Sequence, residues 1–315
     1  MHVLVTGGSG FIGRSVVARL KDEIQVTAPA LRLPTSDISP SHLNDHHDNQ
    51  LFRDWNDVMA GKDVVVHLAG RAHLMHDPAN DPLSAFRAIN VDGTINLARM
   101  ASQHAVKRFV LISSIGVNGR KTDATGFNEN TPPAPHADYA LSKWEAECEL
   151  WKITKGTNME VVIIRPPLVY AGNAPGNFHR LLQIIKAGIP LPLGSINNQR
   201  SMIALENIVD FIFLCIHHPA AANELFVISD GTDVSTPEII RCLAKGMNRR
   251  SYLFPIPQSV LRTGASILGK SALYSQLCDS LVVDSRKARR LLGWKPTTPT
   301  DTALVKAGHD YMATT

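Results

Sequence analysis

Short apolar runs alternate along the chain with amphipathic stretches of helical length. Continuous apolar runs of this length are typical of strands that are covered on both faces, as in a parallel sheet. Strand alternating with helix predicts the α/β class with a doubly wound sheet, since right-handed crossovers make successive strands parallel. The predicted strands are residues 3–5, 24–28, 63–68, 108–113 and 161–165, with an edge strand at 225–229.

A glycine series follows the first predicted strand. Gly7, Gly10 and Gly13 are three residues apart and accompany a helix that we expect to begin at Phe11. Glycine lets the backbone turn tightly and approach a pyrophosphate, and the first amides of the helix, around Phe11 and Ile12, would hold its charge. The series therefore predicts a dinucleotide site. The alternative is a tight strand-to-helix turn that binds no ligand.

The glycine series also sets the expected domain organisation. We expect a Rossmann-type, dinucleotide-binding domain in residues 1–170, to which residues 204–229 return. Residues 171–315 would form mainly a smaller, C-terminal substrate-binding lobe. The substrate would then lie between the two parts, at the carboxyl ends of the strands.

The end of the second predicted strand lacks the acidic residue that usually binds the ribose 2′-hydroxyl of NAD. It reads Ala-Pro-Ala-Leu-Arg, at residues 28–32. An arginine in this place can instead contact a 2′-phosphate. We therefore favour NADP over NAD, with Arg32 and Arg14 as the contacts. The alternative is that both are solvated surface arginines.

Composition narrows the class of protein. The 315 residues are 44% hydrophobic with a formal net charge of +4, which fits a globular protein with an anionic substrate and no nucleic-acid partner. The four cysteines form no metal or disulfide pattern, and His42, His46 and His47 lack metal-site spacing, so no metal is expected. Without a signal peptide or a bilayer-length apolar run, we expect a cytoplasmic protein with no membrane partner.

Residues 255–277 allow two interpretations. Their amphipathic pattern is that of a membrane-surface helix, or of a helix that packs on the substrate lobe or on a partner chain. The segment contains few Lys or Arg residues, so we favour packing.

The candidate chemistry lies between Ser114 and Lys143. Tyr139 and Lys143 are four residues apart, so a helix places both on one face. A neighbouring ammonium and an oxidised nicotinamide favour the phenolate, which would lower the tyrosine pKa and make it a usable proton donor or acceptor. Ser114, at a strand end, would hydrogen-bond the reacting oxygen. The alternative is an exposed amphipathic helix without a catalytic role.

These motifs occur in the order and spacing of the extended short-chain dehydrogenase/reductase family, which the chain resembles over essentially its whole length. That family includes the sugar-nucleotide epimerases, dehydratases and reductases. The resemblance implies that Ser114, Tyr139 and Lys143 form the catalytic triad, and it implies a homodimer through the helix that carries Tyr139. Beyond the glycine turn, the implied cofactor-binding residues are Leu68, Ala69, Gly70, Asn90, Tyr139 and Lys143.

A second group of motifs, after Tyr170, resembles the places where this family holds a nucleotide diphosphate. Arg200 would pair with the pyrophosphate, because a guanidinium matches phosphate oxygens in a bidentate way. Asn177 and Phe178 would contact the sugar nucleotide, and Ser114 its reacting oxygen. The alternative for Asn177 and Phe178 is an ordinary loop and helix cap.

Departures from the family patterns favour one branch. Residues 115–118 lack the Asp-Glu pair that a 4,6-dehydratase needs, and Val117-Asn118-Gly119 stands where a 4-epimerase usually carries Val-Tyr-Gly. The sequence looks closest to bacterial reductases of UDP-4-keto-6-deoxy-N-acetylhexosamines, which serve surface-polysaccharide (lipopolysaccharide) synthesis and are often labelled UDP-glucose 4-epimerases. We therefore expect NAD(P)H-dependent reduction of a C4 keto group on a UDP-sugar. The alternatives are a UDP-hexose 4-epimerase that retains its NAD, and a non-catalytic dinucleotide-binding scaffold or redox sensor.

Overall fold

A parallel sheet forms the centre of the molecule. The computed structural model describes residues 1–29, 55–72, 81–123 and 125–314. In this part of the chain the sheet has six strands in the order β2-β1-β3-β4-β5-β8, all parallel. The predicted α/β class is confirmed, and so is the edge strand near residue 225. The strands are β1 (His2–Thr6), β2 (Gln25–Thr27), β3 (Val64–His67), β4 (Arg108–Ile112), β5 (Glu160–Arg165) and β8 (Glu224–Val227).

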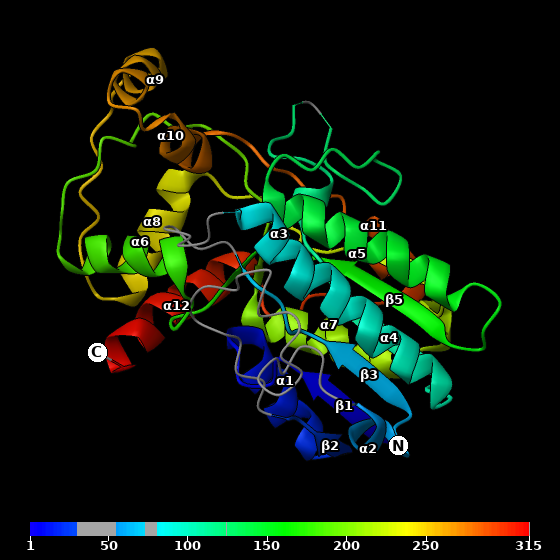
Figure 1. Ribbon diagram of the computed structural model, residues 1–315. Coiled ribbons are helices and arrows are strands. Elements are labelled where there is room, and N and C mark those ends of the chain that lie inside the picture. Colours follow the sequence, from blue (N-terminus) through cyan, green and yellow to red (C-terminus); the bar gives the residue numbers. More distant parts are fainter. Residues whose placement is uncertain (30–54, 73–80, 124, 315) are drawn as a thin grey trace.

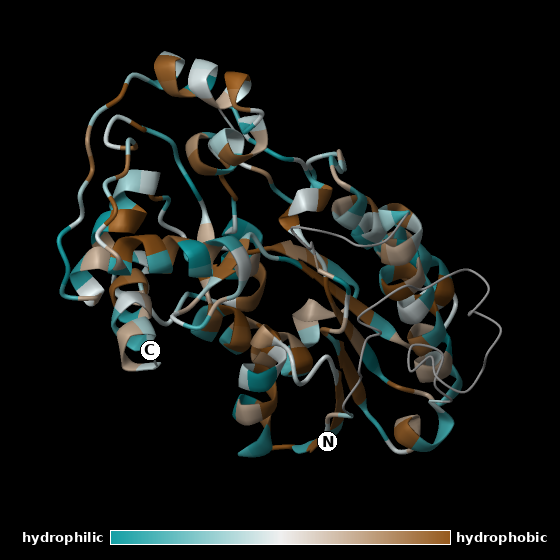
Figure 2. Cartoon of the chain, turned by 60° about the vertical axis from the view of Figure 1, so that its left-hand side comes forward, coloured by the Kyte–Doolittle hydropathy of each residue, from teal (hydrophilic) through white to brown (hydrophobic). Residues whose placement is uncertain are grey.

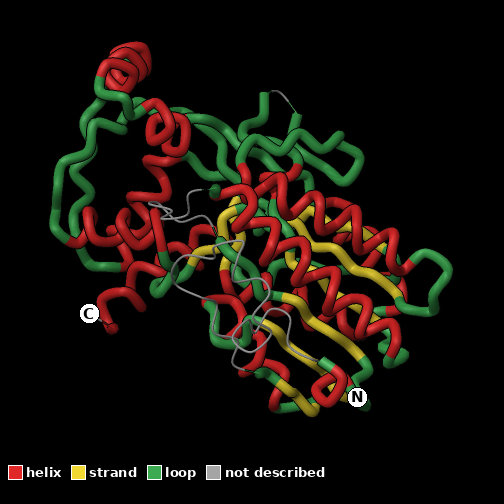
Figure 3. Tube along the Cα trace, in the orientation of Figure 1, coloured by secondary structure: helices red, strands yellow, loops and turns green. Residues whose placement is uncertain are grey.

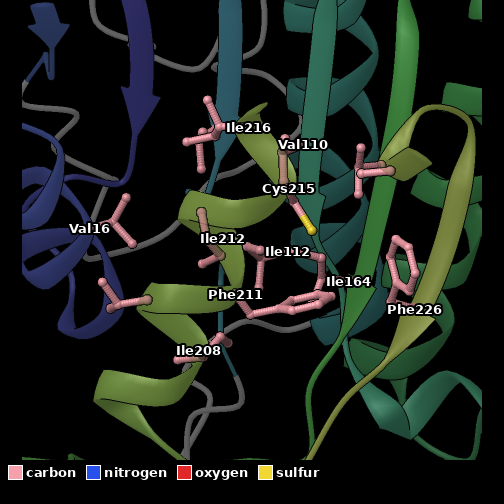
Figure 4. Packing of buried hydrophobic residues seen from close by; sticks show 14 of the residues in the cluster. Val16, Val110, Ile112, Ile164, Ile208, Phe211, Ile212, Cys215, Ile216 and Phe226 are labelled. Carbon is pink, nitrogen blue, oxygen red and sulfur yellow. The ribbon is translucent and has the colours of Figure 1, made fainter. Parts of the chain in front are cut away.

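Helices cover both faces of the sheet, because alternate residues of a strand point to opposite sides. Val3 and Val5 of β1 belong to the core against α1, α7 and α11, whereas Leu4 belongs to the core against α2, α4 and α5. In the first of these layers Phe211 of α7 lies against Ile164 of β5 (Figure 4). These helices are α1 (Phe11–Lys21), α7 (Leu205–His217), α11 (Arg286–Leu292), α2 (Asn56–Met59), α4 (Gly93–Gln103) and α5 (Asp138–Thr154).

Asn90 lies inside a continuous helical stretch. Helix α3 (Pro82–Arg87) continues through a π-helical segment, η3 (Ala88–Asp92), directly into α4. π-Helical turns are rare and occur frequently at functional sites. Here the wider turn contains Asn90, whose side chain is buried.

A second hydrophobic core lies beside the sheet (Figures 1 and 3). Helices α8 and α12 approach closely in it, because an added Cβ at Gly308 would lie 2.2 Å from the Leu243 carbonyl oxygen. We call the helices of this part, together with α9 and α10, the second lobe. The predicted division into a domain of residues 1–170 and a smaller lobe of residues 171–315 stays a prediction. The core contains residues of α6 (Gly176–Lys186), α8 (Thr236–Gly246), α12 (Thr300–Thr314) and of the paired short strands β6 (Leu168–Tyr170) and β7 (Met202–Ala204).

The amphipathic segment 255–277 forms two helices, α9 (Gln258–Ile267) and α10 (Ser271–Cys278), at the far end of the second lobe. Helix α9 contains no buried residue. Figure 2 shows hydrophobic positions along its ribbon, and the side chains of Val260 and Ile267 are exposed. Within the described part of the chain, α9 packs on the second lobe through partly buried Leu261, and packing on a partner chain stays a prediction. None of the described helices has the length and apolar character needed to cross a membrane.

The strand order identifies the edge of the sheet at which a ligand would bind. Strand β1 pairs with β2 on one side and with β3 on the other, so the chain reverses its direction of travel across the sheet at β1. Ligands of open α/β sheets bind outside the carboxyl ends of the strands at such a point. Gly7 follows β1 and Leu68 follows β3, so both lie at this edge.

Candidate active site

The glycine turn and the end of β3 meet at the carboxyl edge of the sheet. Gly7 has a φ of 71°, and a Cβ added to it would lie 2.6 Å from the amide nitrogen of Ala69. A Cβ at Gly13 would lie 2.0 Å from the Gly7 carbonyl oxygen. The structure thus brings Gly7 and Gly13 together with Leu68 and Ala69. Neither glycine position has room for a side chain.

This turn fits the phosphates of a dinucleotide. Helix α1 begins at Phe11, and its N-cap residue Gly10 makes no side-chain cap hydrogen bond. The amides of a first helical turn have no partner within the helix, so those of Phe11, Ile12 and Gly13 can donate to an anion. The residues present therefore fit the predicted cofactor, although its contacts stay a prediction.

The choice between NAD and NADP depends on residues near β2. This strand ends at Thr27, and neither Ala28 nor Pro29 carries a carboxylate. Arg14 is exposed beside the glycine turn, where its Nε donates to the carbonyl oxygen of Ser9 over 2.7 Å. Arg32 lies outside the described residues. The preference for NADP stays a prediction.

A chain of buried hydrogen bonds connects Thr6, at the end of β1, with Asn90 in η3. His67, the last residue of β3, contacts Thr6 Oγ1 through Nδ1 at 2.6 Å and Thr94 Oγ1 through Nε2 at 2.9 Å. Thr94 in turn donates to the carbonyl oxygen of Asn90 over 2.7 Å. Because Thr94 uses its proton on Asn90, it accepts from His67 Nε2–H, which leaves Nδ1 as the acceptor for Thr6. The contacts therefore require a neutral imidazole.

Burial agrees with a neutral His67. It lowers the pKa of this imidazole to about 3, and the nearby Lys143 ammonium acts in the same direction. A charged imidazole would lose its hydration and would have no acceptor for its second proton. His67 was not singled out in the sequence, where its place in an apolar run suggests only a strand residue.

Asn90 continues the hydrogen-bonded chain towards the predicted catalytic helix. Its Oδ1 accepts from the amide of Arg71 at 2.8 Å, and its Nδ2 donates to Ser142 Oγ at 3.0 Å. Ser142 then donates to the carbonyl oxygen of Tyr139 over 2.8 Å. Asn90 thus fixes the loop after Gly70 relative to the first turn of α5, which is a supporting position of the kind that the family resemblance implies.

Tyr139 and Lys143 lie on α5, as predicted. The helix is close to the end of β3, the strand beside the glycine turn. A Cβ added to Gly70 would lie 3.9 Å from Lys143 Nζ. The half-buried ring of Tyr139 packs edge-on against Phe86 of α3, with 6.0 Å between ring centroids. Lys143 is 4% exposed. The helix therefore delivers both groups to the ligand-binding edge of the sheet.

Burial changes the pKa values of both groups. It raises the pKa of the Tyr139 phenol to about 12 in the protein itself, and the lowering expected beside an oxidised nicotinamide stays a prediction. Burial also lowers the pKa of Lys143 to about 8, and the Glu147 carboxylate opposes that change. Desolvation therefore determines the direction of the phenol's pKa shift in the protein itself. Tyr139 is a protonated phenol at neutral pH in this structure.

Ser114 follows β4 and lies beside α5. Its Oγ accepts from the amide of Gly116 at 3.1 Å, as the cap of a short 3₁₀ turn, η4 (Ile115–Val117). A Cβ added to Gly116 would lie 3.3 Å from both Ser114 Oγ and Ala140 Cβ. No described residue accepts the Ser114 proton. The hydroxyl is therefore available to a reacting oxygen near the start of α5.

A buried ion pair below this site was missed in the sequence. Arg165 at the end of β5 donates to both carboxylate oxygens of Glu147, from Nη2 at 2.5 Å and from Nε at 3.0 Å. Its Nη1 donates to Asn118 Oδ1 at 3.0 Å, and Ser113 Oγ donates to Glu147. The sequence contains one signal that could have drawn attention to Glu147. It lies four residues after Lys143, which places both side chains on the same face of the helix.

The predicted substrate residues lie in and beside the second lobe. Arg200 is half-buried, and its Nη1 donates to the carbonyl oxygen of Asp279 at 3.1 Å, with no carboxylate partner among the described residues. Burial lowers its pKa. Asn177 is exposed and donates to Gln276 Oε1 at 2.9 Å, whereas Phe178 is buried against Tyr170. All three substrate contacts stay predictions, and Phe178 has a packing role in this structure.

Metal binding has no candidate among the residues that the structure describes. No group of three or more His, Cys, Asp or Glu side chains there is arranged to hold an ion. His42, His46 and His47 lie outside the described residues.

Comparison with known proteins identifies the family of the chain and relatives with a similar sequence or fold. A 40% identical relative over 306 residues, covering 93% of this chain and 90% of the relative, is the UDP-glucose 4-epimerase of Vibrio cholerae. A 28% identical one, covering 82% and 77%, is the N-acetyl-alpha-D-glucosaminyl-diphospho-ditrans,octacis-undecaprenol 4-epimerase of Escherichia coli O157:H7. The fold matches that of UDP-glucuronic acid 4-epimerase from Bacillus cereus in complex with NAD, with a TM-score of 0.78, 21% identity and coverage of 99% and 96%. Since the family model also matches residues 3–229, the chain belongs to the NAD dependent epimerase/dehydratase family.

Proposed function

We propose that the protein reduces the C4 keto group of a UDP-linked 6-deoxy-N-acetylhexosamine. A bound NADPH or NADH supplies the hydride that adds to C4. Tyr139 donates its phenolic proton to O4, so that the carbonyl becomes a hydroxyl. Ser114 hydrogen-bonds O4 as negative charge develops there, and Lys143 stabilises the phenolate that Tyr139 leaves behind.

The placement of Tyr139 and Lys143 on α5, with the Ser114 hydroxyl beside that helix, is the observation that carries this proposal, and their protonation states agree with it. Reduction needs an acid at O4, and burial holds the phenol in its protonated form at neutral pH. Lys143, with a pKa near 8, is mostly an ammonium at that pH and can compensate the phenolate charge after transfer. The two groups therefore begin in the states that a reductase requires.

Asn118 gives further support. It stands where a 4-epimerase usually has tyrosine, and it is 2% exposed. Its amide binds Arg165 and donates to the carbonyl oxygens of Asn128 and Thr131, at 3.3 and 3.2 Å. A phenol cannot make these contacts, so the loop after Ser114 is built around asparagine. This departure supports a branch other than the usual 4-epimerases.

The UDP-hexose 4-epimerase is the second candidate, and the 40% identical relative from Vibrio cholerae favours it. Such an enzyme would use Tyr139 first as a base and then as an acid, and would return the hydride to the opposite face of the same sugar. Its cofactor would not need to leave between turnovers.

The decisive experiment follows nicotinamide absorbance when purified protein, with NADPH and separately with NADH, meets a UDP-4-keto-6-deoxy-N-acetylhexosamine. We expect catalytic oxidation of the cofactor, and its rate with each form tests the preference for NADP. No oxidation, together with interconversion of UDP-hexoses without added cofactor, would replace this proposal by the epimerase. Neither activity would contradict both.

A further inference from the structure

The far end of the second lobe exposes large apolar side chains. Among the described residues ten large hydrophobic side chains are strongly exposed, and five of them lie between residues 254 and 273. Ile267 and Leu268 are the most exposed of all, at 79% and 70%. We call these five the apolar tip, and they are Phe254, Val260, Ile267, Leu268 and Leu273.

The apolar tip follows one face of α9. Val260, Ile267 and Leu268 are separated by seven and eight residues, which places them on the same side of a helix. The inward side of α9 is represented by Leu261, which packs partly on the core of the second lobe. Leu277 of α10 packs there too. The helices are thus attached through other residues, and the apolar tip is left for a partner outside this core.

Charge identifies the kind of partner. Residues 247–278 contain no Asp or Glu and include Arg249, Arg250, Arg262 and Lys270. None of these four cations forms an ion pair in the part of the chain that the structure describes. The adjoining segment 187–201 also lacks acidic residues, and it contacts the tip region where the Gly194 amide donates to the Phe254 carbonyl oxygen.

We propose that the apolar tip, with its surrounding cations, binds reversibly to the surface of an anionic lipid bilayer. A helix with an apolar face beside Lys and Arg residues lies in the interface, where the apolar face enters the boundary of the headgroups and the cations meet anionic lipids. A second copy of the chain is a poorer occupant, because a symmetric contact would bring two acid-free, positively charged segments together.

Docking there would place the predicted substrate site next to the membrane. Gln276 of α10 accepts from Asn177, and the Asp279 carbonyl that follows α10 accepts from Arg200. The sequence alone favoured packing of this segment and no membrane partner. The exposure of α9 is what changes that expectation, and the inference does not depend on which C4 reaction the enzyme performs.

The test is co-sedimentation of the full chain with vesicles of phosphatidylcholine alone and of phosphatidylcholine mixed with phosphatidylglycerol. We expect binding to the anionic vesicles that weakens with added salt, and binding to the neutral ones that is weaker by about tenfold. The double variant Ile267→Ser/Leu268→Ser should lose binding by about tenfold or more, and Arg262→Gln/Lys270→Gln should lose it specifically on anionic vesicles. The control Leu291→Ser, which changes an exposed leucine on α11, should bind like the wild type.

Sedimentation velocity separates the competing occupant. A dimer that dissociates only in Ile267→Ser/Leu268→Ser would assign this face to a second copy and overturn the proposal. Equal binding of wild type and that variant, or no binding of the wild type to anionic vesicles, would overturn it as well. Because both substituted residues are exposed, unchanged melting temperature is expected and confirms that the fold is intact.

Discussion

Two arginines, one at the end of the central sheet and one in the segment that leads into β7, show how differently two regions of the molecule use charge. Arg165, at the end of β5, donates to both oxygens of Glu147 and to Asn118, and is 4% exposed. Arg200, in the segment leading from the second lobe into β7, is half-buried and donates one side-chain hydrogen bond, to a carbonyl oxygen. The first guanidinium is saturated within the fold, whereas the second retains donors.

The difference predicts a structural role for Arg165 and supports the proposed ligand-binding role of Arg200. Breaking a saturated buried pair leaves an uncompensated charge, so it costs stability. A guanidinium with unused donors and no carboxylate partner gains most from an incoming anion. Residues 161–205, which contain both arginines, include no Asp or Glu, so the acid that neutralises Arg165 comes from α5 while nothing comparable reaches Arg200 in the described part of the chain.

The largest effect is expected for the proposed proton donor, Tyr139. Tyr139→Phe removes the proton donor but keeps the ring against Phe86, so kcat should fall by about 10²- to 10⁴-fold. Cofactor affinity, measured by titration of NADPH fluorescence, should change little. Turnover close to that of the wild type would contradict the role of Tyr139 as the acid.

Glu147→Gln tests whether the Arg165 network is structural. The substitution leaves the buried guanidinium without its charge partner, so the free energy of unfolding should decrease by about 3–5 kcal/mol. Denaturant unfolding followed by circular dichroism measures this. Glu145→Gln is the matched control, since Glu145 lies on the same helix and pairs with the exposed Arg87. An equal loss in the two variants would refute the distinction.

Arg200→Gln tests whether the arginine with unused donors binds the substrate. Loss of a charge-assisted contact to a diphosphate, worth about 1.5–3 kcal/mol, should raise KM for the UDP-sugar by about 10- to 100-fold. Stability should change little because one hydrogen bond to a carbonyl is removed. Steady-state kinetics and thermal melting distinguish these outcomes, with Arg180→Gln, an exposed arginine of α6, as control. A lower melting temperature with unchanged KM would make Arg200 a structural residue.

The last effect, which accumulates gradually with pH, concerns acid. The folded pKa of His67, about 3, lies below its ordinary value of 6.5, so between these pH values the unfolded chain binds a proton that the folded chain does not. The stability from His67 is therefore complete above pH 6.5 and decreases by about 1.4 kcal/mol per pH unit as the pH falls through that window.

Denaturant unfolding between pH 7 and pH 4 measures this slope. His67→Gln should flatten it by about that amount, and His217→Gln, which changes an exposed histidine, should retain it. An unchanged slope in His67→Gln would show that other groups carry the acid sensitivity.

Much of the nucleotide-binding side could be predicted because its signals are local. Apolar runs predicted the strands, and the glycine spacing placed the turn at Gly7 and Gly13 where no Cβ fits. The helical spacing of Tyr139 and Lys143 also predicted a shared face correctly. Each of these features depends on neighbouring residues, so periodicity and spacing reveal them.

Other features depend on residues that are distant in the sequence, and these were missed. The chain Thr6–His67–Thr94–Asn90 and the pair Arg165–Glu147 join different strands and helices. The π-helical turn that contains Asn90 was missed, because such a turn has no clear sequence pattern. The lowered pKa expected for Tyr139 beside an oxidised nicotinamide stays a prediction, and the desolvation that opposes it could not be predicted because it depends on what surrounds the phenol.

By itself, the sequence determined the α/β class, the phosphate-binding turn, the family and the order of the candidate catalytic residues, since backbone preferences and short-range spacing specify them. Only the tertiary structure decided which charges are neutralised, in which protonation state Tyr139 and His67 exist, and that α9 remains exposed. Burial and partner choice are properties of the packed chain, because the free energy of a charge or an apolar side chain depends on the atoms that surround it.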